Sequence, residues 1–221
     1  VGAIPDGSIS TCSNATGTAR DMPITVSGFS GPIVDISVSI TFNPGHTYRN
    51  DLIATLIAPN GTSHVLFGKV GQTTTNCPGA LSMSGTFVFV DPSVPGSQNI
   101  WSSTAAGTYF TTPQGFNGSP NPPAATAFTS VFSGLSNAQI NGNWILRIVD
   151  TVSGDTTTVT DASLTLTPAV TSFTVTASPG ANGGLSCPSP VNAGQTSTCT
   201  ATPNLGYVTQ SISGCGGTAT G

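Results

Sequence analysis

Short runs of alternating apolar and polar residues, each closed by Gly or Pro, constrain the fold of this chain more than any other feature. In residues 33–42, the apolar residues Ile36, Val38, Ile40 and Phe42 alternate with polar ones. A period of two places one face of a strand on a core and the other in water. The 27 Gly and 17 Pro interrupt the chain too often for long helices. The pattern predicts an all-β protein with many short strands.

Two further apolar strands each carry a carboxylate at one end. One lies in residues 46–62, where Asp51 enters the strand, and the other lies in residues 141–151, where Asp150 leaves it. Most of the sequence between them is rich in the residue types that form loops. We expect both to be core strands of one β-sandwich, with their carboxylates near its rim.

The composition excludes two classes of function. Charged residues make up 5% of the chain, against about 25% in a typical domain. The net charge is −4 and there are four basic residues, which are too few to neutralise nucleic-acid phosphates. No apolar run approaches the ~18 residues of a membrane span. Because the chain starts at Val1, we expect an exported, mature form, with a cloned fragment as the alternative.

The five cysteines indicate disulfides rather than a metal–thiolate site, because no pair has CxxC spacing. In an exported protein, proximity favours a bond between Cys187 and Cys199. Cys12 and Cys77 would then clasp the N-terminal part of the chain. Cys215 is left over, which suggests an intermolecular bond, a free thiol or a partner further downstream.

The pattern changes near Pro168, which divides the chain into residues 1–168 and 169–221. The first part is expected to form the sandwich, and residues 127–132 are expected to re-enter its core. The second part shows three short strands, at residues 173–177, 198–202 and 207–212. About 50 residues make a small core, which a disulfide would help to stabilise.

Calcium is the cofactor that the acidic residues suggest. Hard cations take carboxylate and carbonyl oxygens from irregular loops. Of eight Asp residues, those at strand ends are the candidate ligands: Asp51, Asp91, Asp150 and Asp155. Alternatively, Asp51 or Asp150 pairs with Arg49 or Arg147, or caps a turn.

Catalysis has little support in the sequence. A Ser-His-Asp site needs a base close to its nucleophile, and His46 and His64 are the two histidines. We expect His46 in a turn, bonded within its own loop, and His64 on the returning arm of a hairpin. Among the aromatic residues, Trp144 is expected in the core. Trp101 and Tyr109 lie in a long loop, where an exposed platform could bind a glycan.

Residues 24–167 resemble the P domain, or Homo B domain, that follows the catalytic domain of kexin- and furin-type proprotein convertases and also occurs in bacterial secreted proteins. The resemblance implies a jelly-roll-like β-sandwich with no catalytic residues of its own. It departs from the family at Asn50, where Gly is usual, and at Ala162, where Trp is frequent. The motifs that carry it are residues 46–52, 59–62, 89–91, 132–134, 142–150 and 154–155.

Residues 172–221 are similar to a bacterial extracellular repeat module. The similarity rests on residues 174–177, on the Pro-Asn-Leu-Gly-Tyr run of 203–207 and on Ser-Gly-Cys-Gly-Gly at 213–217. In such modules a later cysteine commonly partners the one at the place of Cys215. The resemblance therefore implies an incomplete module.

These patterns predict a non-catalytic, secreted or cell-surface structural or adhesive protein, and the two resemblances indicate a bacterial source. Open strand edges recruit strands from other chains, so we expect self-assembly through residues 172–221. Partners would be other copies of the chain or other extracellular modules. The alternatives are an accessory P domain of a secreted subtilisin-like serine protease and a carbohydrate-binding module.

Overall fold

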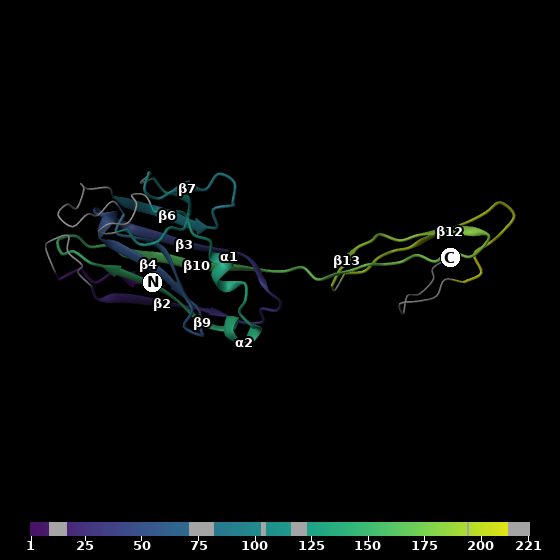
Figure 1. The fold of residues 1–221 in the computed structure, drawn as a ribbon, viewed down its shortest axis with the longest axis horizontal. Helices are drawn as coiled ribbons and strands as arrows, with labels where there is room; N and C mark the ends of the chain where they lie inside the picture. The colour runs from purple at the N-terminus through teal and green to yellow at the C-terminus, as the bar shows by residue number, and fades with distance from the viewer. Residues whose placement is uncertain (9–16, 71–81, 103–104, 116–122, 194, 212–221) are drawn as a thin grey trace. The chain divides into compact units, whose positions relative to one another are not determined.

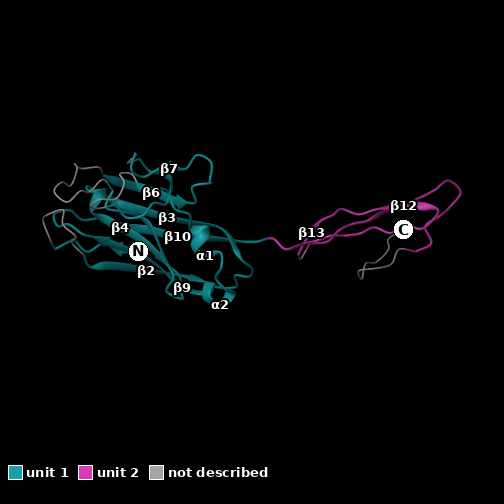
Figure 2. Cartoon of the chain, viewed as in Figure 1, with its two compact units in different colours: residues 1–169 teal, residues 170–221 magenta. Residues whose placement is uncertain are grey.

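The computed structural model describes residues 1–8, 17–70, 82–102, 105–115, 123–193 and 195–211. It separates into two compact units, residues 1–169 and residues 170–221 (Figure 2). Each unit is described by itself below. No helix in these ranges is long and apolar enough to cross a membrane.

Unit 1 contains a four-stranded antiparallel sheet in the order β2-β9-β4-β5 (Figure 1). On β9, Trp144, Leu146 and Ile148 are buried and alternate with partly exposed residues. The core position predicted for Trp144 is confirmed, and its indole N–H donates to the carbonyl oxygen of Ile140 at 2.8 Å. The strands are β2 (Ala19–Val26), β4 (Leu52–Ile57), β5 (Ser63–Gly68) and β9 (Gly142–Asp150).

The second sheet of unit 1 has six strands in the order β1-β10-β3-β6-β8-β7. Its pairs are antiparallel except β6–β8 and β7–β8, which are parallel. The period-two prediction for β3 is confirmed, because Ile36, Val38, Ile40 and Phe42 are all fully buried. The strands are β1 (Gly2–Ala3), β3 (Ile33–His46), β6 (Met83–Val90), β7 (Gln98–Asn99), β8 (Gly107–Phe110) and β10 (Thr158–Pro168).

The two sheets share one hydrophobic core. Phe67 of β5 stacks on Phe89 of β6 with ring centroids 5.2 Å apart, so an aromatic pair joins the two layers. Both rings are fully buried. Burial of one such aromatic side chain contributes about 1.5–3 kcal/mol of hydrophobic stabilisation. The predicted all-β sandwich is thereby confirmed.

Residues 127–132 re-enter the core as predicted, and they do so as the short helix α1 (Phe128–Phe132). The side chain of Asp91 accepts hydrogen bonds from the backbone N–H groups of Phe128, at 2.5 Å, and Thr129, at 3.4 Å. It thus satisfies donors that the first turn of a helix leaves unpaired. Phe128 and Phe132 are four residues apart, so both lie on the buried face.

Unit 1 contains two other short helical segments among its described residues. The 3-10 turn η1 (Arg49–Asp51) leads directly into β4, and α2 (Asn137–Ile140) leads into β9. At α2, Ser136 and Gln139 form a capping box, which satisfies backbone donors at both positions. Helices α1 and α2 are both seen toward the same end of the sandwich in Figure 1.

The described residues of unit 2 form two separate two-stranded ladders. β11 (Ser172–Phe173) pairs with β13 (Val191–Asn192), and β12 (Gly183–Ser186) pairs with β14 (Thr200–Pro203). A disulfide between Cys187 and Cys199 joins the end of β12 to the start of β14. The strand predicted at residues 207–212 is wrong over its described part, because residues 207–211 pair with no strand there.

Candidate functional site

The two carboxylate-bearing strands meet directly in the structure. β4 and β9 are antiparallel neighbours, with Leu52 opposite Asp150. Both the backbone N–H and the hydroxyl of Thr151 donate to the backbone carbonyl of Asp51, at 2.9 and 2.8 Å. Because this register fixes the strand ends, the side chains of Asp51 and Asp150 lie at the same edge of the sheet, and both are buried.

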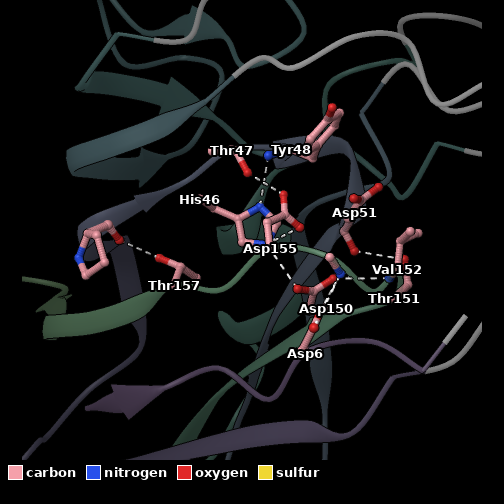
Figure 3. Close-up of polar contacts among 12 residues, drawn as sticks. Asp6, His46, Thr47, Tyr48, Asp51, Asp150, Thr151, Val152, Asp155 and Thr157 are labelled. Carbon is pink, nitrogen blue, oxygen red and sulfur yellow. Dashed lines mark hydrogen bonds and ion pairs between the residues drawn. The ribbon is translucent and has the colours of Figure 1, made fainter. Parts of the chain in front are cut away.

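His46, the last residue of β3, lies between two carboxylates at this edge (Figure 3). Its Nε2 is 3.0 Å from Oδ2 of Asp150 and 3.7 Å from Oδ1 of Asp155. The imidazole is completely buried, whereas Asp155 retains 11% of its side-chain exposure. We call these three residues the His46 cluster.

Neighbouring groups hold each member of the His46 cluster in place. The backbone N–H of Tyr48 donates to Nδ1 of His46 at 3.2 Å, so the neutral ring carries its proton on Nε2 and donates it to Asp150. The free oxygen of Asp150 accepts from the N–H of Val152 at 3.1 Å. The hydroxyl of Thr47 donates to Asp155 at 2.6 Å.

The N-terminal segment and β10 also reach this edge. Both carboxylate oxygens of Asp6 accept from the N–H of Gly154, at 3.1 and 3.3 Å. The hydroxyl of Thr157 donates to the carbonyl of Pro44 at 2.8 Å. These contacts join segments more than 100 residues apart in sequence, so together with the His46 cluster they fasten several segments of the sandwich at this edge.

The charges around His46 raise its pKa above the ordinary value. Burial of the imidazole alone lowers the pKa. The hydrogen bond to Asp150 and the negative charges of Asp155, Asp150 and Asp51 raise it by more. Protonation adds a hydrogen to Nδ1, which must then displace the N–H of Tyr48 from that nitrogen.

The His46 cluster offers three metal-ligand atoms within 4.8 Å of one another, one from each residue. One imidazole and two carboxylates suit zinc, manganese or iron(II), whereas calcium prefers oxygen ligands alone. A metal-bound histidine donates its second ring N–H to an acceptor. Here Nδ1 faces a donor, the N–H of Tyr48, so metal binding requires a rearrangement of that contact.

The four Asp residues predicted as metal ligands lie at two different places in the structure. Asp150 and Asp155 belong to the His46 cluster, and Asp51 lies close enough to influence the charge of His46. Asp91 is elsewhere, where it caps α1 through Phe128 and through both the N–H and the hydroxyl of Thr129.

The alternative pairing of Asp150 with Arg147 is wrong, because Arg147 forms a bidentate ion pair with Asp21 at 2.7 Å. Both partners are about 40% exposed. The position of Arg147 on β9 points its side chain to the opposite face from the buried Leu146 and Ile148, because successive strand residues alternate.

His64 is buried in a second polar contact. Its Nε2 is 3.0 Å from the hydroxyl oxygen of Thr111, and that hydroxyl donates to the carbonyl of Thr126 at 2.6 Å. With the Thr111 proton directed at that carbonyl, His64 Nε2 contacts Thr111 as a donor, and it also lies 3.3 Å from the hydroxyl oxygen of Thr126. Burial lowers the pKa of His64, and the charge of Asp91 opposes this only in part.

The aromatic platform predicted at Trp101 and Tyr109 is wrong for Tyr109. That side chain is fully buried, where its ring stacks on Phe87 and its hydroxyl donates to the carbonyl of Ala105. Trp101 is half-buried, and its indole N–H donates to the hydroxyl of Thr112 at 3.2 Å. Tyr109 therefore offers no ring face to a sugar.

The cysteine predictions are covered only in part by the described residues. Cys187 and Cys199 form the disulfide of unit 2. Cys12, Cys77 and Cys215 lie outside the described residues. The Cys12–Cys77 bond and the role of Cys215 therefore stay predictions.

Sequence reasoning missed His46 as a member of the cluster. The prediction of a bond within its own loop describes only the Nδ1 contact with Tyr48. Asp150 is 104 residues away in sequence, and only the pairing of β3, β4, β9 and β10 brings it near. The signal that was available is that His46 keeps the two-residue spacing of the inward-facing Val38, Ile40 and Phe42, although the intervening Pro44 is exposed.

One family comparison gives a match. Residues 173–220 match the model of the divergent InlB B-repeat domain, a bacterial extracellular repeat. The comparison with curated proteins gives no match. The matched region is confined to unit 2 and gives no support to the P-domain resemblance of residues 24–167.

Proposed function

We propose that this protein is a non-catalytic structural or adhesive component of a bacterial cell surface or extracellular matrix. The observation that carries the proposal is the match of residues 173–220 to an extracellular repeat domain. A repeat of this kind suggests an extracellular or surface location and a structural role. The rigid sandwich of unit 1 suits a spacer or binding scaffold.

The state of the two histidines supports the non-catalytic part of this proposal. His46 has Nε2 bonded to Asp150 and Nδ1 bonded to the N–H of Tyr48. His64 donates to a hydroxyl whose proton is already committed to a carbonyl. Neither ring is arranged to remove a proton from a nucleophile.

Two experiments test this function. Antibodies against the chain should label intact producing cells without permeabilisation. The purified chain should hydrolyse ester, peptide and glycoside substrates no faster than a variant carrying both His46→Gln and His64→Gln. Turnover that disappears in that variant would contradict the proposal, as would labelling only after permeabilisation.

The P-domain resemblance gives a second candidate, an accessory domain of a secreted subtilisin-like protease. The observation that favours it is that the resembling motifs at residues 46–52 and 142–150 are brought together by the β4–β9 pairing. The gene sequence upstream of Val1 discriminates the two. A subtilisin-like catalytic domain there would favour the accessory role, and an export signal directly upstream would exclude it.

For the carbohydrate-binding alternative, the burial of Tyr109 removes half of the expected platform.

A cation bound by the His46 cluster is a separate proposal, carried by the convergence of its three ligand atoms. The imidazole favours zinc or manganese over the calcium expected from the sequence. Metal-stripped protein should gain about 5–10 °C in melting temperature at a zinc or manganese concentration ~100 times the dissociation constant. Calcium should give a smaller gain.

Asp155→Asn provides the test variant for this cation, and Asp161→Asn is its matched control. Asp161 is an exposed carboxylate on β10 outside the cluster. The metal-induced gain should vanish with Asp155→Asn and persist with Asp161→Asn. An equal gain in all three proteins, or none in the parent, would reject a cation at this cluster.

A further inference from the structure

Unit 2 has no core of its own in the part that the structure describes. From residue 170 to residue 211, every described side chain is at least partly exposed. All fully buried apolar residues of the described chain belong to unit 1, from Ile4 to Val159. Two-stranded ladders without a packed face are at best marginally stable, and a β layer normally buries one face against a second layer.

The apolar side chains that such a layer needs are present but exposed. Phe173 is 60% exposed, Tyr207 54% and Val208 87%. A groove lies between the β12–β14 ladder and residues 207–211, with Leu185, Ala201, Tyr207 and Val208 among its lining residues. Clustered exposed apolar groups beside open strand edges are typical of an interaction surface.

The lack of charged residues limits the kind of partner that suits this surface. The last charged residue of the chain is Asp161, so residues 162–221 contain no Asp, Glu, Lys or Arg. The surface therefore offers no charge to attract an acidic or basic partner, and it lacks the charged residues that normally protect strand edges. Two copies of it meet without like-charge repulsion.

The family match points to the same occupant. The matched model describes a repeat domain, and repeats that cannot bury an apolar face alone do so against a neighbouring unit of the same kind. We infer that the groove of unit 2 packs against the same groove in a second copy of this chain. This inference rests on the proposed structural role and names its partner.

The contact has a definite symmetry. If the same patch is used on both molecules, the contact is isologous and closes as a dimer. Each groove then receives Tyr207 and Val208 of the other copy, and the edges of β12 and β14 that pair with no described strand become available to the partner. Dimerisation thus supplies the second layer that the described part of one unit 2 lacks.

Sedimentation velocity of the full 221-residue chain over a range of concentrations tests the inference. We expect a monomer–dimer equilibrium that depends little on salt between about 50 and 500 mM, because salt screens contacts between charges and this surface carries none. Val208→Lys should raise the dissociation constant by about tenfold or more, because each dimer then buries two like charges at one contact. Leu205→Lys, at a fully exposed neighbouring position, is a second variant.

Val34→Lys is the matched control. Val34 is 51% exposed on β3 of unit 1, so the substitution adds the same charge outside the proposed surface and should leave the dissociation constant unchanged. All three sites are exposed, so the variants should fold, and circular dichroism checks this.

Three results would overturn the inference: a monomer at every concentration, an equal loss of affinity in Val34→Lys, or association that weakens strongly with salt. The last two would place the contact on the charged unit 1. A monomer that still labels intact cells and shows no turnover would reject the dimer alone. Failure of the labelling test with an intact dimer would reject the proposed function alone.

Discussion

At the residue scale, two buried histidines have pKa values shifted in opposite directions. His46 is surrounded by the negative charges of Asp150, Asp155 and Asp51, and its pKa is raised despite burial. His64 packs edge-on against Phe128, with ring centroids 5.0 Å apart, and burial lowers its pKa. Since a shifted pKa couples proton binding to folding, the two residues should affect stability with opposite dependence on pH.

The folded protein holds the His46 proton more tightly than the unfolded chain, whose pKa is near 6.5. Its contribution to stability is fully present below pH 6.5 and is lost as the pH rises through the folded value. His64 has a lowered folded pKa, so its contribution is present above pH 6.5 and is lost as the pH falls toward the folded value.

We therefore expect His46→Gln to destabilise the protein more at pH 5.5 than at pH 9, and His64→Gln to do the reverse, where these pH values bracket the ordinary histidine pKa of about 6.5. Urea unfolding in the presence of EDTA, followed by tryptophan fluorescence, measures both. Each variant serves as the control for the other. Parallel pH profiles of the two variants would show that the assigned environments are wrong.

At the element scale, α1 depends on a residue that is distant in sequence. Asp91, which follows β6, accepts from the N–H of Phe128 and from the hydroxyl of Thr129. The helix then places Phe132 against Trp144, with ring centroids 5.1 Å apart. One carboxylate thus links the turn after β6 to the packing of β9.

Asp91→Ala should lower the free energy of unfolding by about 1–2 kcal/mol, the usual cost of losing a helix cap. Asp91→Asn retains an oxygen acceptor and should cost less. The same Asn variant removes the charge that raises the pKa of His64, so this pKa should fall further in an NMR titration. Equal stability of all three proteins would mean that the carboxylate does not support α1.

The difference between α1 and β3 shows how far the sequence predicts this fold. The burial of Ile36 to Phe42 follows from local alternation alone, so β3 was predictable. Residues 128–132 contain Phe, Thr and Val, which favour strands, so the local pattern does not indicate the helix, whose first N–H groups donate to the distant Asp91. The same reason hid the His46 cluster, because strand pairing rather than spacing brings Asp150 to His46.

At the scale of the whole molecule, stability and charge are concentrated in unit 1. All of the chain's Asp, Lys and Arg residues precede residue 162, and the described core ends at Val159. Unit 2 has only short ladders and one disulfide in its described part. The two units should therefore respond separately to changes in their own covalent structure.

The Cys187–Cys199 disulfide closes a loop with a sequence separation of 12 residues. Such a loop contributes about 3 kcal/mol on the chain-entropy model, which is large for a unit whose described side chains are all partly exposed. In a Cys187→Ser, Cys199→Ser variant, amides of residues 183–203 should lose most of their protection in hydrogen exchange. Amides of β4 and β9 should keep theirs, because their core lies within unit 1.

Protection that survives in residues 183–203 would mean that packing, rather than the covalent link, holds these strands together. Protection lost equally in β4 would mean that the sandwich needs unit 2 in order to fold.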